Sequence, residues 1–72
     1  MTIIQEAKQH NNYIVEIRKE RFEDLHTAYD TYTVCVIEED GDVGYVKRKS
    51  ARYHSLEAAR RTYKRYLREV MG

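Results

Sequence analysis

Nine basic side chains stand in residues 43–72, and their type and spacing point most directly to a chemistry. Five lie where a helix would turn them away from its apolar side, and four lie just before that helix. Cations gathered on one surface neutralise phosphates, so the set predicts nucleic-acid binding that weakens steeply with salt. A solvated helix face is the plain alternative. The candidate basic face consists of Lys47, Arg48, Lys49, Arg52, Arg60, Arg61, Lys64, Arg65 and Arg68.

The two parts of the chain carry opposite charge. Residues 1–42 hold four basic and ten acidic side chains, a net charge of −6, whereas residues 43–72 hold nine basic and two acidic ones, a net charge of +7. The acidic part could fold back and mask the cations, or complementary faces could join two copies in a homodimer. A foreign partner is the third alternative, and the sequence leaves all three open.

Tyrosine is unusually frequent, with seven copies and no tryptophan. Its large ring and polar tip suit protein interfaces, and it also stacks on unpaired bases. By spacing, Tyr63 and Tyr13 are predicted to belong to the core. The aromatic interface candidates are Tyr29, Tyr45, Tyr53 and Tyr66.

The remaining reactive side chains predict no catalytic, metal or cofactor site. The acidic run 38–42 lacks the ligand spacing of a calcium loop and is interpreted as a charged hairpin tip. The three histidines have no spacing that suggests a triad. The single cysteine, Cys35, cannot form an internal disulfide and is predicted to be a small core residue. We therefore expect a binding protein rather than an enzyme.

Three segments have the composition of β-strands. Residues 13–19 alternate between apolar and charged side chains, and residues 32–37 are apolar on both faces, as in the centre of a sheet. Asp40 and Gly41 then favour a hairpin turn, and residues 43–49 return as the third strand. Residues 20–29 between the first two strands predict a long loop or a helical turn.

A helix is expected to follow, from a cap at Ser55 to about Met71. The Ser55 hydroxyl can accept from free amides of the first turn, and apolar residues recur at three- and four-residue steps up to Val70. Residues 2–9 are ambiguous and favour a short helix or an extended arm. The expected fold is α+β, a three-stranded antiparallel β-meander packed on one face by the C-terminal helix.

Residues 53–63, which run Tyr-His-Ser-Leu-Glu-Ala-Ala-Arg-Arg-Thr-Tyr, resemble the strand-to-helix junction of AP2-type and integrase arm-binding domains. In those families three strands precede a helix that opens with a Ser or Thr cap and a Glu-Ala pair, and the sheet reads DNA. The strands here lack the families' glycine and tryptophan signatures. The resemblance therefore transfers no binding residue to this chain.

Two functions from different classes fit these patterns. The first is a nucleic-acid-associated module that contacts phosphates through its basic face. The second is a small protein inhibitor or adaptor, of the kind that phages and mobile elements direct against host machinery. The chain reads as one domain over residues 1–72 and has neither a signal-peptide pattern nor an apolar membrane span. A reducing cytoplasm is the expected location, with a nucleic acid or a host protein as partner and no membrane contact.

Overall fold

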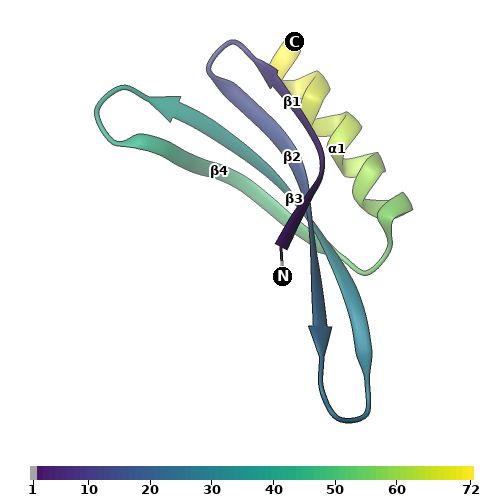
Figure 1. Ribbon diagram of the computed structural model, residues 1–72. Coiled ribbons are helices and arrows are strands. Elements are labelled where there is room, and N and C mark those ends of the chain that lie inside the picture. The colour runs from purple at the N-terminus through teal and green to yellow at the C-terminus, as the bar shows by residue number, and fades with distance from the viewer. Residues whose placement is uncertain (1) are drawn as a thin grey trace.

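The computed structural model describes residues 2–72 as four strands followed by one helix. Helix α1 (Leu56–Met71) lies across one face of an antiparallel sheet (Figure 1). The α+β class, the antiparallel sheet and the C-terminal helix on one face are confirmed, whereas the expected number of three strands is wrong. The sheet runs in chain order through β1 (Thr2–His10), β2 (Tyr13–Glu23), β3 (Ala28–Asp40) and β4 (Gly44–Tyr53).

The additional strand is β1, which includes residues 2–9, where the sequence predicts a short helix or an extended N-terminal segment. It pairs antiparallel with β2 along its length, but a register shift between Ile4 and Glu6 interrupts the alternation of its side chains. The turn into β2 places Asn11 in the left-handed region, at φ 54°, which asparagine tolerates better than most residues. Because β1 lies at the sheet edge and is mostly exposed, it lacks the regular apolar period that identifies a strand.

The core lies between α1 and the two central strands. Val15 and Ile17 of β2 and Val34 and Val36 of β3 point to the helix side, because they occupy alternate positions along their strands. All four are almost fully buried. Helix α1 covers them with three residues of the predicted apolar stripe, namely Ala59, Tyr63 and Tyr66.

Both ends of α1 are closed by hydrogen bonds. The Ser55 side chain accepts from the backbone N–H of Ala58 at 3.1 Å, which confirms the predicted cap. At the other end the backbone N–H of Gly72 donates to the carbonyl of Arg68 at 2.8 Å. The helix is also joined to β4, because the Tyr53 and Thr62 hydroxyls form a hydrogen bond.

Strands β2 and β3 extend beyond the rest of the sheet. In the described residues, the pairing of β1 with β2 ends at Glu20, and the pairing of β4 with β3 ends at Tyr32. Residues 21–30, which we call the arm, therefore pair only with each other. Figure 1 shows this hairpin projecting past α1. The expectation of a loop or helical turn over residues 20–29 is wrong, because regular β pairing continues to Glu23 opposite Ala28.

Candidate binding surfaces

Two of the predicted cations, Lys47 and Arg52, lie on the face of the sheet that α1 does not cover, which we call the open face. They stand opposite Ile37 and Thr33 of β3. Those two residues alternate with the core residues of the same strand and therefore point away from the helix. Both cations are exposed.

The other seven predicted cations lie on the helix side of the molecule. Lys49 stands opposite the core residue Val36, and Arg48 lines the same pocket as Lys49 and Glu69 of α1. The five cations of the helix are all exposed, namely Arg60, Arg61, Lys64, Arg65 and Arg68. The expectation of one continuous basic surface is therefore wrong, because strand alternation places Lys47 and Arg52 on the opposite side.

Two cations pair with acids from the first part of the chain. The Arg48 Nη2 atom lies 2.6 Å from Glu38 Oε1, and Arg60 Nε lies 2.7 Å from Glu6 Oε1. Hydrogen bonding from Arg48, together with the neighbouring Tyr13 hydroxyl, lowers the pKa of Glu38. The acidic part thus neutralises the basic part at two points.

Two further cations pair within the second part of the chain. Lys49 Nζ lies 2.7 Å from Glu69 Oε2, and this hydrogen bond lowers the pKa of the Glu69 carboxyl. Arg61 Nη2 lies 3.3 Å from Glu57 Oε1, one helical turn away. Both side chains of the second pair are largely exposed, so it stays accessible to competing anions.

Five of the nine predicted cations form no ion pair among residues 2–72: Lys47, Arg52, Lys64, Arg65 and Arg68. Several acids that could have masked them lie elsewhere. Glu39, Asp40 and Asp42 gather where β3 turns into β4, and Asp24 lies at the tip of the arm. The acidic part therefore leaves the outer surface of α1 positively charged.

Three of these unpaired cations form a short ridge on the outer surface of α1. Lys64, Arg65 and Arg68, which we call the helix ridge, span about 6 Å along the helix axis at ~1.5 Å per residue. The Arg65 guanidinium lies 5.5 Å from the centroid of the Tyr66 ring. That contact is within the range of a cation–π interaction and restrains Arg65 without neutralising its charge. The ridge can therefore attract an anionic partner.

The tyrosines predicted to lie at an interface divide into two classes. Tyr66 is only 8% exposed and belongs to the core, and Tyr53 is half-buried, packs against the core and has its hydroxyl bonded to Thr62. Tyr29 and Tyr45 are 50% and 67% exposed, and their roles in binding stay predictions. The predicted core position of Tyr63 is confirmed.

The open face carries an ion pair and a buried thiol. Arg18 donates to Glu16 through Nε at 2.7 Å. Glu16 stands opposite Cys35 of the adjacent strand, and the charges of both Glu16 and Arg18 act on the Cys35 thiol. Cys35 is 1% exposed, as predicted, but it points away from α1 and lies outside the core under the helix. Burial raises the pKa of the Cys35 thiol, with the charges of Arg18 and Lys47 acting in the opposite direction. The thiol is therefore a poor nucleophile.

Sequence reasoning named Tyr29 as an interface candidate but missed the two other large apolar side chains of the arm, Phe22 and Leu25. Leu25 is 95% exposed at its tip. Below it, Phe22 and Tyr29 stack across the two strands with ring centroids 5.3 Å apart, and the Tyr29 ring lies 6.3 Å from that of His54. An available signal was the presence of Phe22 and Leu25 in an otherwise polar segment. Because residues 21–29 have no buried face, no apolar period distinguishes them from a polar loop.

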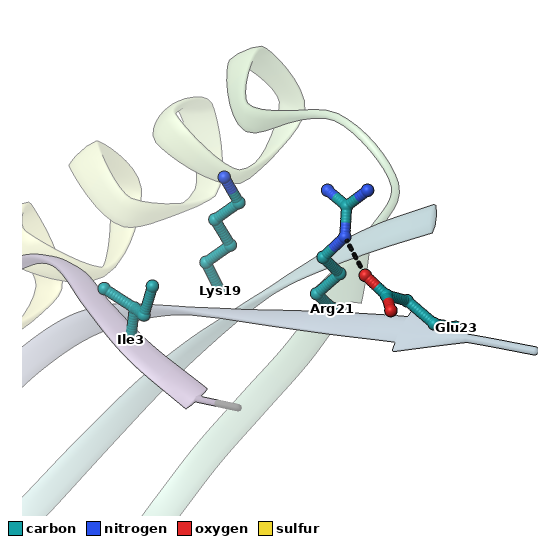
Figure 2. A pocket seen from close by; sticks show the side chains of 4 residues that line it. All are labelled: Ile3, Lys19, Arg21 and Glu23. Atoms are coloured by element: carbon teal, nitrogen blue, oxygen red, sulfur yellow. Dashed lines mark hydrogen bonds and ion pairs between the residues drawn. The ribbon is translucent and has the colours of Figure 1, made fainter. Parts of the chain in front are cut away.

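A pocket of about 370 Å³ lies at the base of the arm and is lined by Ile3, Lys19, Arg21 and Glu23 (Figure 2). Its two cations suggest an anion site, but carboxylates already engage them. Arg21 Nε lies 2.8 Å from Glu23 Oε1, and Lys19 Nζ lies 3.9 Å from an oxygen of Asp30. The pocket is therefore a weaker candidate for phosphate than the helix ridge.

Within residues 2–72, no three histidine, cysteine, aspartate or glutamate side chains gather in a way that could hold a metal ion. Over the same residues, α1 is neither long nor apolar enough to cross a membrane. Comparison with protein-family models, curated proteins and solved structures gave no match to this chain.

Proposed function

We propose that this chain is a non-enzymatic binding module whose basic helix face engages nucleic acid or a nucleic-acid-associated complex. The observation that carries the proposal is the helix ridge, in which Lys64, Arg65 and Arg68 are exposed and have no ion pair in the described chain. An exposed cation without a carboxylate partner can neutralise a phosphate without first breaking an ion pair. Arg61, which is 75% exposed and weakly paired, extends the same surface.

The test measures binding of duplex and single-stranded nucleic acid at about 50 and 200 mM salt. Three phosphate contacts predict a loss of affinity of about 40-fold between these concentrations on duplex DNA, because the logarithmic slope is about −0.9 per contact. Absence of binding at the lower salt concentration, or binding with no salt dependence, would contradict the proposal.

A matched pair of variants locates the contact surface. K64Q/R68Q removes one lysine and one arginine from the helix ridge, and K47Q/R52Q removes the same two residue types from the open face. All four side chains are exposed and form no ion pair in the described structure. We expect the first variant to reduce the salt slope by about 1.8 and the second to leave it unchanged. The reverse outcome would move the site to the open face.

The second candidate function is a protein-directed inhibitor or adaptor, and the exposed apolar side chains of the arm favour it. A leucine that is 95% exposed beside two partly exposed aromatic rings is more typical of an interaction site than of a free surface. A tagged chain should then recover the same protein from its native cell extract with and without nuclease. If the protein is recovered only without nuclease, it is bound to nucleic acid and not directly to this chain.

A further inference from the structure

We infer that the arm is a docking site for a protein that presents an apolar pocket rimmed by lysine or arginine, with Leu25 as the side chain that enters the pocket. The inference deepens the second candidate function and does not depend on nucleic-acid binding by α1. The arm projects from the sheet as a two-stranded hairpin, so a partner can reach its tip from both faces (Figure 1).

The turn at the tip holds Leu25 outward by a set of local hydrogen bonds. Asp24 Oδ1 accepts from the backbone N–H groups of His26 and Thr27, each at 2.8 Å, and from the Thr27 hydroxyl at 3.1 Å. The Asp24 N–H donates to the Thr27 carbonyl at 2.9 Å, which closes the turn. Fixing the backbone on both sides of Leu25 lowers the entropy that binding would otherwise have to overcome.

The base of the arm is braced so that the tip keeps its direction. Phe22 and Tyr29 stack across the strands, and Tyr29 also approaches His54 in the connection to α1. Arg21 lies 2.8 Å from Glu23 and 3.7 Å from Asp30, which links both strands on the other side. An isolated two-stranded hairpin is marginal in water, and these contacts offset that weakness.

The charge of the arm decides which partner it fits. Residues 21–30 carry one basic side chain, Arg21, and three acidic ones, Glu23, Asp24 and Asp30. Arg21 pairs with Glu23 and Asp30, so Asp24, next to Leu25, is the acid of the arm that has no ion pair in the described residues. This carboxylate would repel a phosphate, so an apolar wedge entering nucleic acid does not fit. A protein pocket with an apolar floor for Leu25 and a cationic rim that meets Asp24 matches both properties.

The test places a photo-crosslinking amino acid at position 25 of the full chain. The substituted chain is produced in cells of its natural source, which are then irradiated. Position 43 is the matched control, because Val43 is also apolar and 70% exposed at a hairpin turn, directly after Asp42. We expect one discrete protein adduct from position 25 and not from position 43. That protein is then purified and its affinity for the unmodified chain is measured.

Two variants separate the apolar contact from the charged one. L25A should weaken binding about 10-fold or more, because it removes most of a buried side chain from the complex, whereas V43A should leave the affinity unchanged. D24N keeps the oxygen that holds the turn and removes its charge, so it should weaken binding several-fold at low salt. The expected result is loss with both L25A and D24N.

Other outcomes would overturn the inference. These are no adduct, equal adducts from both positions, an adduct with nucleic acid, an adduct with lipid, or an adduct with a second copy of this chain. Unchanged affinity of L25A, or tighter binding by D24N, would also overturn it. A protein recovered by the tagged chain whose affinity is insensitive to L25A leaves the second candidate function standing and removes only the arm as its site.

Discussion

The body of the molecule and the arm use the same β pairing but differ in what stabilises them. In the body, the side chains of Val15, Ile17, Val34 and Val36 are buried under α1. In the arm, residues 21–29 are all exposed, and the contacts are a ring stack, ion pairs and a capped turn. Burial under α1 therefore stabilises the body, whereas the exposed Phe22, Leu25 and Tyr29 contribute little to folding and are the side chains on which the proposed docking site depends.

The largest expected difference between the two regions is the cost of removing an apolar side chain. I17A should lower the free energy of unfolding by about 2–5 kcal/mol, because it leaves a cavity under α1, and in so small a domain this can unfold the chain. L25A should change it by less than about 0.5 kcal/mol. Urea denaturation followed by circular dichroism measures both. An equal loss in the free energy of unfolding for the two variants would show that Leu25 is packed, and not exposed, in solution.

A smaller effect is expected at the start of α1. S55A removes the acceptor for the Ala58 N–H and should lower the free energy of unfolding by about 1 kcal/mol. S50A is the control, since Ser50 is an exposed strand serine, and it should have little effect. Thermal melts of the two variants make the comparison. A loss as large for S50A as for S55A would contradict the role of the cap.

The smallest effect should be confined to the arm. Hydrogen bonds from the His26 and Thr27 amides lower the pKa of Asp24 in the folded chain. The stabilisation that the ionised Asp24 gives to the folded turn is therefore fully present above the pKa of Asp24 in the unfolded chain. It is lost as the pH falls through the lower pKa of Asp24 in the folded chain. The amide shifts of His26 and Thr27, followed by NMR from neutral pH downward, should titrate with a midpoint below that of an ordinary aspartate.

The matched variant D24N should remove this titration and keep the turn. Core amides such as that of Val34 should not follow the same transition, because residues 21–29 of the arm are all exposed and do not belong to the core. A midpoint at or above the ordinary aspartate range would contradict the turn geometry.

The sequence predicted the parts of the fold in which burial imposes a period. The alternation along residues 13–19 and the stripe from Leu56 to Val70 both became core faces, and the Ser55 cap is present. Strand β1 was not predicted, because the bulge between Ile4 and Glu6 breaks the alternation of its side chains. The β pairing of the arm was not predicted either, because neither face of the arm is buried and no apolar period is therefore required there.

The candidate site was predicted by residue type but not by arrangement. A count of cations treats Lys47, Arg48 and Lys49 as one group, yet successive strand residues point to opposite faces and a bulge lies among them. Nor does a count show which cations find carboxylates. Glu6 lies 54 residues from Arg60, and Glu38 lies 10 residues from Arg48 across a hairpin, so both acids meet their cations only when the chain folds.

The central claim is that the helix ridge, and not the arm or the open face, contacts nucleic acid. The most direct measurement is an NMR titration of the isotopically labelled chain with a short DNA duplex at about 50 mM salt. The account predicts that amide shifts change around Lys64, Arg65 and Arg68, are lost at about 200 mM salt, and leave the arm unaffected. Shift changes centred on Lys47 and Arg52, changes in the arm, or no changes at all would contradict it.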